Sequence, residues 1–155
     1  SAELRRKFRV ALATGENIYG VHRFTELLNA DAVDIIQPDL LCCGGFLEAK
    51  KIAAIAEAHY VTVAPHNPLG LISTAAAVHH SASINNFAIL EWHGDDKKKK
   101  SELVNESWVP KDGYFELPTD AGIGMTLNHN AIKENPPLHW DRGFASYSDG
   151  SPGFL

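Results

Sequence analysis

Apolar residues gather in four short runs within the first 91 positions, and a polar, titratable residue directly follows each run. The runs are rich in β-branched residues and shorter than ordinary helices, which is typical of buried β-strands. They cover residues 9–15, 33–38, 61–65 and 87–90, and the residues that follow them are Glu16, Asp39, His66 and Glu91. We therefore predict four buried strands, each ending at a side chain that can carry charge.

Helical patterns separate these runs. Residues 45–59 carry a broad apolar stripe with charged residues outside it, and residues 21–30 place their large apolar residues on one face. Residues 71–81 are small and apolar, which favours close packing, and residues 1–8 read as the end of a further helix. Strands that alternate with helices of this length indicate βαβ units and a parallel sheet.

The four strand-end residues are expected to share one edge of that sheet. Parallel strands joined by helices all run in the same direction, and the spacing between successive end residues suits one βα unit. In a (β/α)₈ barrel the edge at the carboxyl ends of the strands carries the active site. The pattern thus predicts an α/β fold that corresponds to half of such a barrel.

The character of the chain changes after Glu91, and we place a boundary near residue 94. Residues 1–94 are predicted to form the partial barrel, and residues 95–155 a charged loop and an irregular C-terminal tail. A complete barrel needs about 250 residues. Because an open half-barrel would expose strand edges and its interior to water, we expect an N-terminal half, from the same chain or from a partner.

Composition and charge narrow the classes of partner. The chain has 155 residues and a net charge of −5, which argues against a nucleic-acid partner. Its two cysteines, Cys42 and Cys43, are adjacent and cannot form a secreted disulfide framework, so we expect a reducing, cytoplasmic setting. No apolar run approaches the ~20 residues of a membrane span, and we expect no membrane partner.

The strand-end residues also suggest chemistry. Converging carboxylates can hold a hard divalent cation such as Mg²⁺. An imidazole at the same edge can move protons near neutral pH, and a neighbouring aspartate can hold it in one tautomer. Each residue alone is more often a helix cap, a solvated loop residue or a structural histidine. Four of them in register favour a functional site.

The local sequences around these residues resemble a known family. The segments that carry the resemblance are Ala13–Glu16, Gln37–Asp39 followed by Gly44 and Gly45, Ala64–His66, and Leu90–Glu91. In this order they resemble the C-terminal part of the mandelate racemase and muconate lactonizing branch of the enolase superfamily, most closely its acid-sugar dehydratases of the galactonate and mannonate kind. Residues 111–127 resemble the family segment that returns to the capping domain.

The resemblance implies a role for each strand end. Glu16 would end strand five and match the third carboxylate ligand of an essential Mg²⁺. Asp39 and His66 would end strands six and seven and match an Asp–His dyad, and Glu91 would end strand eight and hydrogen-bond the substrate carboxylate or its enolate. To these we add two candidate substrate-binding residues, Asn67 beside His66 and His22 in the loop after strand five.

The resemblance further implies a Mg²⁺-dependent hydro-lyase, a carbon–oxygen lyase that acts on sugar acids. The enzyme would remove the proton α to the carboxylate, pass through an enediolate and eliminate the β-hydroxyl to form a 2-keto-3-deoxy acid. Members of the family are often homo-oligomers. The first two metal ligands would come from earlier strands, so we expect the chain alone to bind metal weakly and to be inactive.

Three other interpretations stay open. A racemase, epimerase or cycloisomerase of the same superfamily would share the enediolate step. A non-catalytic half-barrel would act as a binding or assembly module, although nothing structural requires this set of four residues. A different (β/α)₈ enzyme would have four strand ends that fail to converge on one edge.

Overall fold

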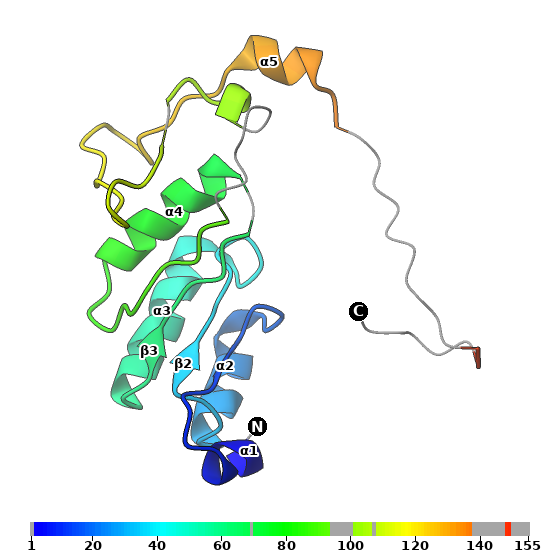
Figure 1. Cartoon of the computed structure of the whole chain (residues 1–155), viewed down its shortest axis with the longest axis vertical. Helices are drawn as coiled ribbons and strands as arrows, with labels where there is room; N and C mark the ends of the chain where they lie inside the picture. The colour runs from blue at the N-terminus through cyan, green and yellow to red at the C-terminus, as the bar shows by residue number, and fades with distance from the viewer. Residues whose placement is uncertain (1, 69, 94–100, 107, 138–147, 150–155) are drawn as a thin grey trace.

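The computed structural model describes residues 2–68, 70–93, 101–106, 108–137 and 148–149 (Figure 1). Short strands alternate with helices over the first half of the chain. The elements are α1 Ala2–Lys7, β1 Ala13–Thr14, α2 Gly20–Asn29, β2 Ile35–Ile36, α3 Gly45–Ala58, β3 Thr62–Val63 and α4 Leu71–Ala82. The predicted helices are confirmed, and each begins and ends within about two residues of its expected bounds.

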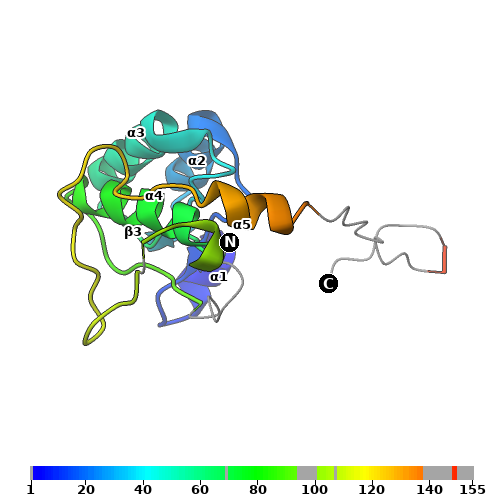
Figure 2. The ribbon, with the colours of Figure 1, turned by 90° about the horizontal axis from the view of Figure 1, so that it is seen from above.

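The three strands form one parallel sheet in the order β1, β2, β3. Ala13 pairs with Ile35, and Ile35 pairs in turn with Thr62. Helix α3 packs between α2 and α4 along one face of this sheet (Figure 2). This is the α/β arrangement with a parallel sheet that the sequence predicts, and it directs all three strands toward the same edge.

The core lies between the sheet and helices α2 and α3. Phe24 from α2, Ile36 from β2 and Ile52 from α3 are fully buried there. Burying a side chain of this size is worth about 1.5–3 kcal/mol relative to leaving it exposed. These contacts fix the positions of the strand ends relative to one another.

The predicted fourth strand, residues 87–90, forms a single parallel bridge, Val63 to Phe87, instead of a ladder. The Val63 amide donates to the Asn86 carbonyl and the Ala88 amide to the Val63 carbonyl, each at 2.8 Å. Pro65 cannot extend this pairing because proline has no N–H to donate. The segment therefore follows β3 in the predicted direction but with fewer hydrogen bonds than expected.

Two further short helices occur after residue 100: η1 Ser101–Leu103 and α5 His129–Glu134. The segments beside them are joined by an antiparallel bridge between Val104 and Leu127. The Asn128 side chain caps α5 by accepting from the Ala131 amide at 3.1 Å, a capping signal that the sequence analysis missed. The last part of the predicted loop and tail, residues 135–155, lies mostly outside the described residues.

No helix in the described parts of the chain is long and apolar enough to cross a membrane. The two cysteines are both free, with Cys42 exposed and Cys43 buried.

Gly15 lies where the β1 backbone turns toward Glu16, and an alanine there is expected to destabilise the protein. Its φ is +142°, and an added Cβ would lie 2.9 Å from the Gln37 amide nitrogen and 3.0 Å from a Phe24 ring carbon. We expect Gly15→Ala to lower the free energy of unfolding by about 1–3 kcal/mol or more. Thermal unfolding of the complete protein measures this. Gly70→Ala, at ordinary φ and with open space around it, should change little.

Candidate active site

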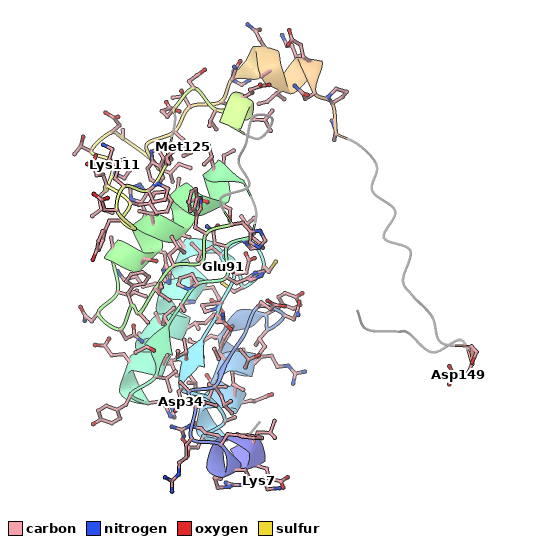
Figure 3. The ribbon with its side chains drawn as sticks, in the orientation of Figure 1. Lys7, Asp34, Glu91, Lys111, Met125 and Asp149 are labelled. Carbon is pink, nitrogen blue, oxygen red and sulfur yellow. The ribbon has the colours of Figure 1, made fainter. Side chains whose placement is uncertain are left out.

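The carboxyl edge of the sheet brings the four predicted residues together around His66. Its Nδ1 lies 2.9 Å from Asp39 Oδ2, and its Nε2 lies 3.2 Å from Glu16 Oε2 and 3.9 Å from Glu91 Oε2. Figure 3 shows Glu91 at the opposite end of the sheet from Asp34, which lies just before β2. This convergence is the opposite of what the interpretation as a different (β/α)₈ enzyme predicts.

Asp39 is held rigidly and almost without solvent, at 3% exposure. Its Oδ1 accepts from the Leu41 amide at 2.7 Å, which leaves Oδ2 for the His66 ring. Its carbonyl accepts from the amides of Cys42 and Cys43 as the chain turns into α3. A carboxylate fixed in this way selects the imidazole tautomer that carries its proton on Nδ1.

The other ring nitrogen, His66 Nε2, faces the more open part of the site. The side chain of Glu16 is 53% exposed and that of Glu91 is 36% exposed, whereas the Asp39 side chain is 4% exposed. In the neutral ring with its proton on Nδ1, Nε2 carries a lone pair that can accept a proton from a bound molecule in place of its 3.2 Å contact with Glu16. The Asp39–His66 pair therefore has the geometry of an oriented general base.

The cysteines beside Asp39 do not add a nucleophile to this edge. Burial, followed by the charge of the nearby Asp39, raises the pKa of the Cys43 thiol to about 11. Burial, followed by the Asp39 charge, also raises the pKa of Cys42. Both thiols are thus protonated near neutral pH, and the reactive thiolate form is suppressed.

Asn67 is closely associated with the site, but its side chain is buried at 1% exposure. Its backbone amide donates to Glu91 Oε2 at 3.0 Å, and its Nδ2 donates to the Glu91 carbonyl at 3.1 Å and to Thr74 Oγ1 at 3.0 Å. The predicted part of Asn67 in substrate binding would therefore be indirect, through Glu91. Thr74 carries no signal of a functional role in the sequence, because it lies in a run of small residues without a motif.

His22 is exposed on α2 and is not among the residues that contact His66 in the described chain. It lies near Glu48, whose pKa is lowered first by the hydrogen bond from the Val21 amide, then by Lys51 and, least, by His22. The Glu48 carboxylate accepts from Val21 at 2.9 Å and so ties α3 to the start of α2. A substrate-binding role for His22 remains a prediction without support from this geometry.

A match to a family model accompanies this geometry. Residues 1–131 match the model described as enolase C-terminal domain-like. The chain belongs to this family. The predicted resemblance to the mandelate racemase and muconate lactonizing branch of the enolase superfamily is therefore confirmed.

Relatives of known name are sugar-acid dehydratases. The chain is 38% identical over 122 residues to D-xylonate dehydratase of Haloferax volcanii, a match that covers 79% of this chain and 30% of the relative. It is 34% identical over 151 residues to D-galactonate dehydratase of Xanthomonas campestris, covering 92% of this chain and 39% of that enzyme. The matched regions thus cover between 30% and 39% of the length of these enzymes.

Solved structures show the same relationship. An enolase from Agrobacterium radiobacter with bound sodium and L-malate is 39% identical, with a TM-score of 0.87 over 99% of this chain and 42% of its own. A mandelate racemase/muconate lactonizing enzyme-like protein from Rubrobacter xylanophilus is 40% identical, with a TM-score of 0.79 over 86% of this chain and 34% of its own. The described elements therefore match one part of these larger enolase-superfamily structures.

Proposed function

We propose that this chain forms strands five to eight of a (β/α)₈ barrel and carries the general base of a sugar-acid dehydratase. The observation that supports this most directly is the Asp39–His66 pair, whose Nε2 faces Glu16 and Glu91 at the carboxyl edge of a parallel sheet. The relatives are named as dehydratases, and these names support a hydro-lyase, a more specific activity than proton transfer alone.

In this proposal His66 removes the proton α to the carboxylate of the substrate. Asp39 holds Nδ1–H at 2.9 Å, so Nε2 presents its lone pair and becomes the protonated nitrogen after transfer. The Asp39 carboxylate then stabilises the positive ring. The electrons left on the α-carbon form the new C–C double bond as the β-hydroxyl takes a proton from a general acid, such as the protonated His66, and leaves as water; the enol product then tautomerises to a 2-keto-3-deoxy acid.

Glu91 and Glu16 border the space in which the substrate carboxylate would lie. Glu91 Oε2 accepts from the Asn67 amide on the side of His66 that faces this space, and Glu91 Oε1 lies 4.0 Å from His93 Nε2. Glu16 is more exposed and lies two residues after the end of β1, whereas the segment that carries Glu91 runs beside β3 at the other side of the sheet. The two carboxylates therefore limit the approach to Nε2 from both sides.

The donor chemistry of Glu16 fits a Mg²⁺ ligand, because Mg²⁺ prefers carboxylate oxygen and this carboxylate is half exposed at the edge of the sheet. Within the described residues, no group of three or more His, Cys, Asp and Glu side chains is arranged to hold a metal. Glu16 would thus supply one ligand of a site that other strands complete. A bound Mg²⁺ would stabilise the negative charge that develops on the substrate carboxylate.

A racemase or epimerase is the second candidate, because the Rubrobacter xylanophilus neighbour carries a mandelate racemase-like name at 40% identity. Such an enzyme would also begin by removing the α-proton. It would then return a proton to the same carbon from the opposite face and keep the β-hydroxyl. The product therefore separates the two candidates.

Product analysis of the complete protein tests the proposed function. With Mg²⁺ and a panel of sugar acids that includes D-xylonate and D-galactonate, we expect a 2-keto-3-deoxy acid, detected by NMR and by its semicarbazone absorbance. Chelation of the metal should stop its formation. An epimer without loss of water would favour the racemase. Unchanged acids that also retain their α-protons in deuterium oxide would contradict both candidates and favour a non-catalytic module.

A further inference from the structure

Asn67 makes a network of hydrogen bonds that the proposed proton transfer does not itself require. Its side chain is 1% exposed, and both of its Nδ2 protons are used, one on the Glu91 carbonyl and one on Thr74 Oγ1. Because the carbonyl oxygen can only accept, this contact sets the orientation of the amide. Asn67, the residue after His66, therefore contacts both Glu91 and helix α4.

The register between residues 63–67 and residues 87–91 places Asn67 beside Glu91, where its Nδ2 donates to the Glu91 carbonyl. Val63 pairs with Phe87, and Asn67 and Glu91 each lie four residues further along in the same register. Pro65 interrupts the supply of backbone donors between these two levels. At the level of Glu91, the Asn67 backbone N–H donates to the Glu91 carboxylate and its side-chain Nδ2 donates to the Glu91 carbonyl, and these two bonds join the segments.

The same residue controls the Glu91 carboxylate. The Asn67 backbone amide donates to Glu91 Oε2 at 3.0 Å, and this oxygen is also the one that lies 3.9 Å from His66 Nε2. The Glu91 side chain is 36% exposed, so without this bond it would gain rotamer freedom toward solvent. Asn67 therefore donates to both ends of Glu91, its carbonyl and its carboxylate, while His93 Nε2 lies 4.0 Å from the second carboxylate oxygen.

Thr74 in turn fixes Asn67. It lies in the first turn of α4, is 1% exposed, and its Oγ1 accepts from Asn67 Nδ2 while facing the Gly70 carbonyl at 3.4 Å. A hydroxyl can accept from the amide and donate to the carbonyl at the same time, which a valine of similar shape cannot do.

We propose that Asn67 is a positioning residue that acts through Glu91, with Thr74 as its anchor. This inference rests on the proposed function, because it assigns Glu91 a part in handling the substrate. If it is correct, substitutions at Asn67 or Thr74 lower kcat only in a protein that still has Glu91, because they act by displacing the Glu91 carboxylate.

A double-mutant cycle in the complete protein tests this dependence. Asn67→Ala is expected to lower kcat by about 10- to 100-fold, as misplacement of a reacting group by an ångström can do. Thr74→Val should lower kcat by a smaller factor. Thr74→Ser, which keeps the hydroxyl, should have most of the kcat of the natural protein. In a Glu91→Ala background neither Asn67→Ala nor Thr74→Val should lower kcat further. Equal losses in both backgrounds would overturn the proposal.

Thr25→Val is the matched control for loss of a hydroxyl. Thr25 Oγ1 donates to the Val21 carbonyl at 2.9 Å within α2, much as Thr74 faces the carbonyl four residues before it. This variant should keep the kcat of the natural protein. A loss as large as that of Thr74→Val would indicate a general effect of removing buried hydroxyls.

A crystal structure of the ligand-free Thr74→Val protein provides a measurement that does not depend on the reaction. We expect the Glu91 carboxylate to leave the Asn67 amide and the neighbourhood of His66 Nε2. A carboxylate that stays in place would overturn the proposal whatever the kinetics show. If the carboxylate moves but no sugar acid is converted by the natural protein, the proposed function fails and the positioning role of Asn67 survives.

Discussion

Replacing His66 by asparagine in the complete protein is expected to abolish exchange of the substrate α-proton in deuterium oxide. Asparagine keeps a polar group of similar size beside Asp39 but has no nitrogen that can accept a proton near neutral pH. General-base catalysis contributes about 10²- to 10⁴-fold in rate, and we expect a loss at the upper end of this range. Proton NMR of the sugar acid in deuterium oxide measures exchange separately from dehydration.

The matched control for this variant is His59→Asn. His59 ends α3, is exposed, and its backbone amide donates to the carbonyls of Ala56 and Glu57. It should exchange the α-proton at the rate of the natural protein. Retained exchange in His66→Asn, with the fold intact by thermal unfolding, would show that the base is another residue.

Asp39→Asn is expected to lower kcat by about 10³- to 10⁴-fold, with a smaller effect on KM. The asparagine Oδ1 can still accept from the Leu41 amide, so its NH₂ group would face His66 Nδ1. That arrangement favours the tautomer with its proton on Nε2, and this nitrogen then has no lone pair for the substrate. Loss of the correct tautomer in an otherwise intact triad has an effect of this size.

Asp112→Asn serves as the control for the change from carboxylate to amide. Asp112 is exposed in a turn at φ +51°, a left-handed conformation that asparagine also adopts readily. This variant should be fully active. If Asp39→Asn matched it in kcat, His66 would not depend on Asp39 for its tautomer, and the dyad would have to be abandoned.

The alternation of apolar runs and helical stripes was enough to predict the order of elements and the edge at which the site lies. The apolar runs at residues 33–38 and 61–65 need burial on both faces of the strand, and a parallel sheet covered by helices provides this burial. Because such strands share one direction, Asp39 and His66 had to meet at the same edge. Their 2.9 Å contact confirms this part of the prediction.

The sequence was less informative where a residue depends on a partner distant in the chain. Asn67, beside His66, was expected to touch the substrate, but it lies buried under Glu91 and Thr74. Thr74 has no local signal at all, because its hydroxyl matters only once α4 packs against the end of residues 61–67. The six-residue helix α5 was missed because a segment this short has little periodicity to detect.

What the sequence determined by itself is therefore the periodicity, and with it the strand direction, the helix faces and the set of residues at the carboxyl edge. These follow from local geometry, since side chains repeat every two residues in a strand and about every 3.6 in a helix. Only the tertiary structure decided which oxygen of Glu91 faces His66 and which side chain holds it. Such choices depend on packing and on the register between segments more than twenty residues apart, and no local pattern records them.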